Sequence, residues 1–199
     1  MQIAGWPAIC NHANGQTSFM NPSRLVCFLF LSVVLVASSV AAEKNPPGDI
    51  PDNQVFLKYA SAAGGYSLKV PEGWARIEDG ADVSFTDKYN SVNVTVTNAA
   101  APPTAKNVLV ESPLADLAKS GRAIKVKSVT EKKLPGGPVM LVKYDSDSEP
   151  NRVTNKILRL ENEAYVFFKD GRVAILTVSA PRGADNVDQW KLISESFAW

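Results

Sequence analysis

The chain has 199 residues, a formal net charge of +1, 45% hydrophobic residues and 21% charged residues. This size and composition are typical of one soluble globular domain or two small ones, and not of a disordered or fibrous protein. Because the chain lacks the basic excess of most nucleic-acid-binding proteins, we expect no nucleic acid as a partner.

Residues 1–42 are typical of a secretory signal peptide. Arg24 precedes the apolar run of residues 25–37, and small residues follow as far as Ala42. A basic residue, a short apolar core and a small-residue exit predict cleavage after Ala42. The run is shorter than the about 20 apolar residues of a membrane span, so the mature protein is not expected to cross a membrane. Met20 fits as the true initiator, since the segment before it is polar and long for a signal peptide.

The leader predicts export to the periplasm or secretion. Two alternatives stay open. An uncleaved leader would act as a membrane anchor. A plastid transit peptide would lead to the thylakoid lumen, and residues 1–24 lack acidic residues as such peptides do.

The absence of cysteine and histidine beyond the leader excludes several kinds of site. Cys10, His12 and Cys27 all precede residue 43, and Arg24 is the only charged residue of the leader. The expected mature chain is therefore neutral overall and can form no disulfide. It lacks the imidazole and thiolate ligands of the usual zinc, copper, haem and iron–sulfur sites. It also lacks the nucleophile pairs that depend on histidine or cysteine.

A proline-rich linker and a single domain follow the leader. Residues 43–54 contain three prolines and a glycine, which is typical of an extended tether. We expect the domain to cover residues 55–199. In its first half apolar residues alternate with polar ones, which predicts strands of an antiparallel sheet. These strands are expected at residues 65–70, 83–85 and 92–96.

The second half predicts further strands between two helices. Ser112 and Pro113 are typical of a helix start, so a short helix is expected over residues 113–120. The last two strands are expected to form a hairpin around Asp170 and Gly171, because Asp-Gly favours tight turns. The strands of this half are expected at residues 123–134, 139–144, 155–168 and 172–179.

A closing helix is predicted over residues 186–198, with Asp185 as its cap. Apolar residues recur there at intervals of three and four, which predicts one stripe packed on the sheet. The stripe consists of Val187, Trp190, Ile193 and Phe197.

Together these elements predict an α+β domain with about seven mostly antiparallel strands and helices packed against them. The large apolar side chains on the expected inner faces should form its core. These are Tyr66, Trp74, Phe85, Trp190 and Phe197.

Three acidic residues at alternate positions form a candidate calcium site. Asp145, Asp147 and Glu149 could supply oxygen ligands from one loop. The glycine and glutamate of a helix–loop–helix calcium loop are missing, since Pro150 and Lys156 stand at those positions. A solvated hairpin loop is the alternative, and no other cofactor is expected.

Basic residues form a candidate interaction surface for an acidic protein or a membrane surface. The ordinary polar face of a half-exposed sheet is the alternative. The candidate residues are Lys125, Lys127, Lys132, Lys133 and Arg152.

Several segments, in their order along the chain, carry a resemblance. They are GYSLKVPEGW at residues 65–74, DVSFTD at 82–87, SVNVTV at 91–96, GRVAILTVSA at 171–180 and WKLISESF at 190–197. In these segments the chain resembles the PsbP family, the extrinsic proteins of photosystem II and their wider bacterial relatives. The resemblance implies a three-layer α/β/α sandwich around a central antiparallel sheet. It also implies a protein that is not an enzyme, because the best-known members dock on the lumenal face of photosystem II and help to retain calcium and chloride.

We therefore expect an exported, non-enzymatic accessory protein that binds a protein partner at a membrane face. The common general base and the common nucleophile are both missing from the expected mature chain. Two alternatives are a small secreted hydrolase that uses carboxylates and a carrier of a small ligand. A deep pocket with converging acids would favour these alternatives.

Overall fold

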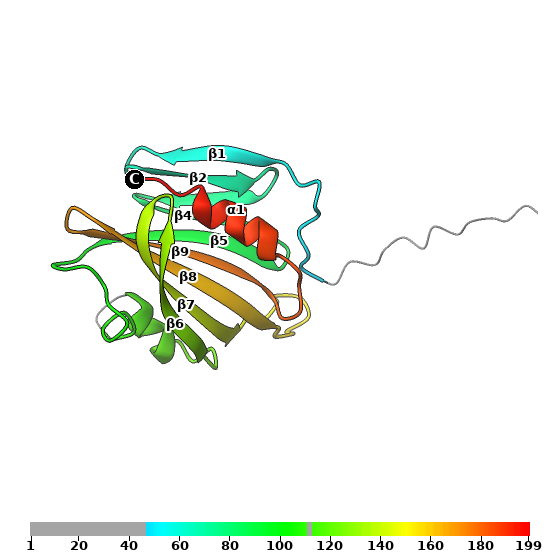
Figure 1. Ribbon diagram of the computed structural model, residues 1–199. Coiled ribbons are helices and arrows are strands. Elements are labelled where there is room, and N and C mark those ends of the chain that lie inside the picture. The colour runs from blue at the N-terminus through cyan, green and yellow to red at the C-terminus, as the bar shows by residue number, and fades with distance from the viewer. Residues whose placement is uncertain (1–46, 111–112) are drawn as a thin grey trace, which may run out of the picture. The chain divides into compact units, whose positions relative to one another are not determined.

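The computed structural model describes residues 47–110 and 113–199, so the expected leader lies outside the described residues. The described part is built on a seven-stranded antiparallel sheet in the spatial order β3-β4-β5-β9-β8-β7-β6 (Figure 1). Strand β9 lies between β5 and β8, so the last strand of the chain is a central one. The strands are β3 (Ala75–Asp79), β4 (Asp82–Asp87), β5 (Asn90–Asn98), β6 (Lys125–Leu134), β7 (Gly137–Asp147), β8 (Arg159–Lys169) and β9 (Arg172–Pro181).

A two-stranded sheet and the closing helix cover one face of this sheet. Strands β1 (Phe56–Ser61) and β2 (Tyr66–Pro71) pair with each other, and helix α1 (Val187–Glu195) lies beside them (Figure 1). Leu68 of β2 and Ile193 of α1 belong to the same buried cluster as Leu176 of β9. We call this side of the sheet the α1 side.

The opposite face is covered by the segment that follows β5. Val108 and Leu114 pack there against Val142 and Ile175 of the sheet. Leu114 belongs to η1 (Pro113–Lys119), which is a 3₁₀ helix. The expected mostly antiparallel sheet is therefore confirmed, but the three-layer α/β/α arrangement is not, because α1 is the single α-helix among residues 47–110 and 113–199.

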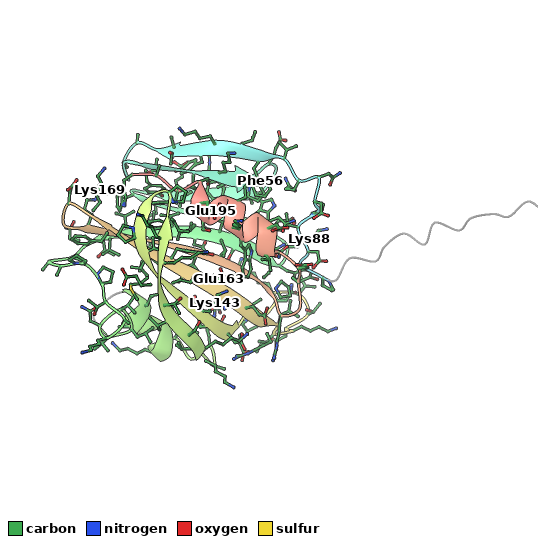
Figure 2. The ribbon with its side chains drawn as sticks, in the orientation of Figure 1. Phe56, Lys88, Lys143, Glu163, Lys169 and Glu195 are labelled. Carbon is green, nitrogen blue, oxygen red and sulfur yellow. The ribbon has the colours of Figure 1, made fainter. Side chains whose placement is uncertain are left out.

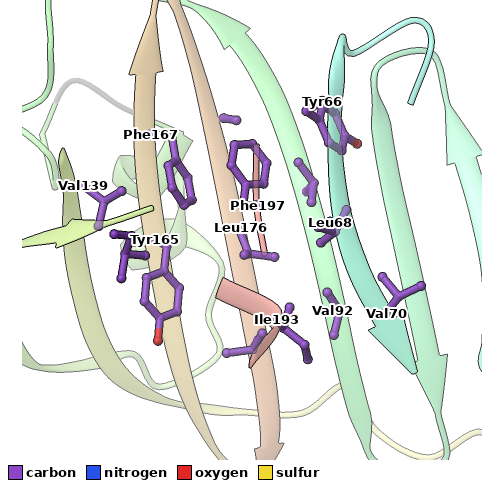
Figure 3. Packing of buried hydrophobic residues seen from close by; sticks show 14 of the residues in the cluster. Tyr66, Leu68, Val70, Val92, Val139, Tyr165, Phe167, Leu176, Ile193 and Phe197 are labelled. Atoms are coloured by element: carbon purple, nitrogen blue, oxygen red, sulfur yellow. The ribbon is translucent and has the colours of Figure 1, made fainter. Parts of the chain in front are cut away.

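Phe197 is at the centre of the core on the α1 side. Its ring is stacked between Phe167, with centroids 4.1 Å apart, and Tyr66, at 5.6 Å (Figure 3). Phe85 is buried in the same cluster. Trp74, in the turn after β2, is only half-buried against this cluster.

The expected apolar stripe of α1 is only partly buried. Ile193 is fully buried, whereas Trp190 is half-buried and Val187 is 73% exposed. Val187 thus projects beyond the core, whereas the helix from Gln189 onward packs on it. The expectation that the whole stripe packs on the sheet was therefore wrong for Val187, whereas Trp190 packs against the core without being fully buried.

The end of the expected linker is docked on the start of α1. Asn186 Oδ1 accepts a hydrogen bond from the Ile50 backbone N–H at 2.7 Å, and Asn186 Nδ2 donates to the Gly48 carbonyl at 2.9 Å. Gln189 Nε2 donates to the Ile50 carbonyl at 3.1 Å. Ile50 is 4% exposed. This stretch is part of the folded domain and not an extended tether, and Asn186, rather than Asp185, is the N-cap position.

We expect Asn186→Ala to destabilise the domain by about 1–3 kcal/mol, because it leaves the buried Ile50 N–H without its acceptor. Chemical denaturation measures the loss, and limited proteolysis should cleave residues 48–52 more readily. Asp185→Ala is the matched control, since this exposed neighbour interacts with Asp49 through its backbone. Equal stability of the two variants would contradict the docking.

We expect Phe197→Ala to lower the free energy of unfolding by about 3–5 kcal/mol, the range for truncating a fully buried aromatic ring. Val187→Ala, in the same expected stripe, should change it by no more than about 0.5 kcal/mol, since exposed positions contribute little. Thermal denaturation of both variants checks the difference. A larger effect at Val187 than at Phe197 would contradict the described packing.

Candidate binding groove

A groove of about 390 Å³ lies on the α1 side of the sheet, between the first half of α1 and strands β6, β7 and β8. Apolar side chains from the sheet and the helix form part of its lining, namely Leu141, Tyr165, Val187 and Trp190. Charged side chains form another part, namely Lys127, Lys132, Lys143, Glu161, Glu163 and Lys191.

A β-bulge in β6 decides which of its lysines belong to this side. The pairing of β6 with β7 shifts register between Val126 and Ser128, so that one residue is inserted there. In an uninterrupted strand Lys125 and Lys133 would lie on the same side of the sheet. Instead, Lys132 pairs with Val139, a core residue of the α1 side. Lys132 therefore lies on the side of Lys125, and Lys133 lies on the opposite side.

Lys127, at the bulge, is held by two carboxylates. Its Nζ lies 2.7 Å from Asp145 Oδ1 and 3.2 Å from Glu161 Oε1. The Asp145 side chain is only 6% exposed, so this ammonium group compensates a nearly buried charge. The interaction with Asp145, followed by that with Glu161, raises the pKa of Lys127. Lys127 thus stabilises the fold, and the expectation that it is free for a partner was wrong.

A second charged network lies on β7 and β8. Lys143 Nζ is 2.5 Å from Glu163 Oε1, and the Tyr165 hydroxyl donates a hydrogen bond to Glu163 Oε2. Figure 2 shows Lys143 and Glu163 close to each other on the sheet. Burial, followed by the hydrogen bond to Glu163, raises the pKa of Tyr165. Tyr165 is therefore neutral at physiological pH and serves here as a hydrogen-bond donor.

The groove has an excess of positive charge. Its lining includes four lysines and two glutamates. Asp145 shares Lys127 with Glu161, and Arg182 lies near Glu161, so the groove and these two neighbours together carry an excess of two positive charges. Each glutamate already interacts with a lysine of the same groove, Glu161 with Lys127 and Glu163 with Lys143. Within the described part of the chain, Lys132 and Lys191 have no such acidic partner.

The other candidate interaction residues do not converge on the groove. Lys125 and Lys133 are exposed on opposite sides of β6, and Arg152 is exposed in the loop between β7 and β8. The expected basic face is thus a basic edge along β6, consisting of Lys125, Lys127, Lys132 and Lys133. Arg152 does not belong to this edge, because it lies outside β6.

The acids of the candidate calcium site are each engaged by a basic side chain. Asp145, Asp147 and Glu149 lie close to Lys127, Arg159 and Arg122, respectively, at 2.7, 2.9 and 3.7 Å. Residues 47–110 and 113–199 contain no group of three or more histidine, cysteine or acidic residues that could hold a metal ion. The geometry therefore gives the calcium hypothesis no support.

Sequence reasoning missed several residues of the groove. Lys143, Glu163 and Lys191 give no local signal, because each stands within the regular pattern of its own strand or helix. The alternation of Glu161 and Glu163 on β8 is a signal that two carboxylates share one side of that strand. Their pairing with lysines of β6 and β7 depends on strand order, which no local pattern contains.

The PsbP family matches residues 54–198. The chain belongs to the PsbP family. Cyanobacterial PsbP (CyanoP) from Synechocystis sp. PCC 6803 has a similar structure, with a TM-score of 0.52 and 17% sequence identity over 75% of this chain and 96% of that one. This likeness shows that the two proteins share a fold.

A further similar structure is LpqN, involved in cell envelope biogenesis of Mycobacterium tuberculosis. It has a TM-score of 0.41 and 13% identity over 77% of this chain and 98% of that one. No curated protein matches the chain. Over the residues that the structure of this PsbP-family protein describes, no helix is long and apolar enough to cross a membrane.

We expect Lys127→Met in this PsbP-family domain to cost about 1–3 kcal/mol, because it leaves the Asp145 carboxylate buried without its cation. Asp145→Asn in the same chain should restore most of the loss, since it removes the charge that the lysine compensates. Denaturation of the two single variants and the double variant measures this coupling. Additive losses would show that the two groups do not interact in the folded protein.

Proposed function

We propose that this protein is an exported, non-enzymatic accessory protein that binds an acidic surface of a partner protein at a membrane face. The observation that carries the proposal is the basic edge of β6. This strand is the last of the seven-stranded sheet, with β7 as its one neighbour in the strand order. Its ten residues contain four lysines and one glutamate.

The exposed lysines of the edge are suited to contact another molecule. Lys125, Lys132 and Lys133 are exposed, and no ion pair involves them in the described ranges. Exposed charges of one sign accelerate the encounter with an oppositely charged surface and orient the two partners. Because β6 presents lysines on both of its sides, an acidic partner would contact it along the edge rather than on one face.

The chemistry of the groove supports a binding role rather than catalysis. Its glutamates are paired with lysines, so they are neither clustered like paired catalytic carboxylates nor free to act as bases. The chain beyond residue 42 also has no histidine or cysteine. Carboxylate hydrolysis would need an acid in a setting that raises its pKa.

The proposed location rests on the leader and on the family. Arg24, the apolar run and the small residues up to Ala42 favour export. The resemblance described above implies an extrinsic protein bound to a membrane complex, and the similar cyanobacterial structure carries the PsbP name. An exported domain held to a membrane face by charge needs no membrane-spanning segment of its own.

The proposal is tested by capturing partners from the native membrane fraction at low and high salt. We expect the wild-type protein to retain a defined protein at low salt and to release it at high salt, because exposed charges are screened within about 8 Å at physiological ionic strength. Lys125→Glu/Lys133→Glu should abolish capture at both salt concentrations.

The matched control is Lys58→Glu/Lys69→Glu, a charge reversal at two exposed lysines that face each other on β1 and β2. This variant should capture the partner as the wild type does. Capture that is indifferent to salt and to both reversals would overturn the proposed binding surface. A hydrolytic activity that disappears when one acid is mutated would overturn the non-enzymatic role.

A further inference from the structure

The groove shares Lys127 and Lys132 with the basic edge, and it combines these lysines with an apolar wall from the sheet and from α1. We propose that the groove binds a small amphipathic anion, a molecule with one anionic head group and an apolar body. Lys132 and Lys191 would hold the head group, and Trp190 would pack against the apolar body. This inference does not depend on the proposed partner protein.

The sign of the ligand follows from the ion pairs in the groove. Glu161 and Glu163 are poorly placed to attract a cation, because each already has a lysine nearby, at 3.2 and 2.5 Å, respectively. Glu161 shares its lysine, Lys127, with Asp145. Arg182 lies a further 3.9 Å from Glu161. Of the four lysines that line the groove, Lys132 and Lys191 form no ion pair with an acid of the described residues. A ligand with one anionic group would therefore find the two cations available.

The apolar part of the ligand follows from the packing of α1. Trp190 is half-buried and lines the groove, while Val187 is 73% exposed beside it. An exposed valine next to an incompletely buried indole gains from contact with an apolar body. Leu141 and Tyr165, which are buried in the core, form the adjoining part of the lining.

The size of the groove limits the ligand to a small molecule. A volume of about 390 Å³ lies in the lower part of the range of about 300–1,000 Å³ that is typical of small-molecule pockets. Its lining combines lysine side chains with apolar ones. A medium-length alkyl chain with a terminal carboxylate or phosphate fits this description. The two head groups share the chemistry that lysine recognises.

The bulge in β6 gives the groove one of its cations. With regular alternation Lys133, and not Lys132, would lie on the α1 side of the sheet together with Lys125. The inserted residue exchanges these two lysines and places Lys132 in the groove. The pair Lys132 and Lys133 thus supplies a groove residue and a matched control that are adjacent in the chain.

The test is calorimetric titration of the purified protein with four decyl probes below their micelle concentrations. They are decanoate, decyl phosphate, decanol and decyltrimethylammonium. We expect both anions to bind, decanol to bind at least about tenfold more weakly, and the cation not to bind. The difference between decanoate and decyl phosphate indicates which head group the site prefers. The fluorescence of Trp190 should change with the anions, and Trp190→Phe should remove that change.

Lys132→Ala and Lys191→Ala should each weaken decanoate binding by about tenfold, whereas Lys133→Ala should leave it unchanged. Both residues are exposed, so the variants should keep the wild-type melting temperature, which is measured alongside. Equal binding of decanoate and decanol, or equal affinities of Lys132→Ala and Lys133→Ala, would overturn the proposal. Failure of this test leaves the partner-capture result unaffected, because that experiment varies Lys125 and Lys133.

Discussion

The structure depends on a sheet whose central strands are buried on both faces. In β9 nearly every residue from Val173 to Pro181 is buried, and β8 shows the same pattern from Ala164 to Phe167. Apolar side chains on both faces of one sheet require a separate cover for each face. The β1–β2 hairpin, α1 and Phe197 cover one face, and the segment around Val108 covers the other. The order of the elements along the chain meets this requirement. The β1–β2 hairpin directly precedes β3 and α1 follows β9, while the segment around Val108 connects β5 to β6.

The groove forms because α1, which covers part of the α1 side of the sheet, is short. Helix α1 contains nine residues, and its first residue, Val187, lies beyond the core. The part of the α1 side that lies beyond it therefore carries charged side chains on β6, β7 and β8. Because this region is only partly exposed to water, its acids are stabilised by nearby lysines, as in the Lys143–Glu163 pair. Removing charges from water is costly unless they are paired closely, and the short distances meet this condition.

Most strands could be predicted from the sequence, because their alternation is strong and local. The exceptions have physical reasons. In β3 every residue is exposed, so the segment shows no hydrophobic alternation. In β1 only Ser61 is fully buried, which leaves too weak a pattern. The start of α1 was also misjudged, because Val187 fits the helical period but lies beyond the core. The groove could not be predicted at all, since its residues come from three strands and a helix whose spatial order is absent from local patterns.

The lysines of the basic edge could serve only to protect an edge strand from unwanted pairing. The position that the bulge gives to Lys132 distinguishes this protective role from a binding role. Lysines and bulges on an edge strand prevent unwanted pairing with other strands, and any lysine position along β6 would serve that purpose. Protection therefore accounts for Lys125 and Lys133, which are exposed on opposite sides. It does not account for the position of Lys132, which lines a groove together with Lys191 from a distant part of the chain. Nor does it require Lys127 to compensate Asp145 on the neighbouring strand. The bulge thus has a second consequence besides protection, because it brings one lysine to a buried acid and another to the apolar wall of α1.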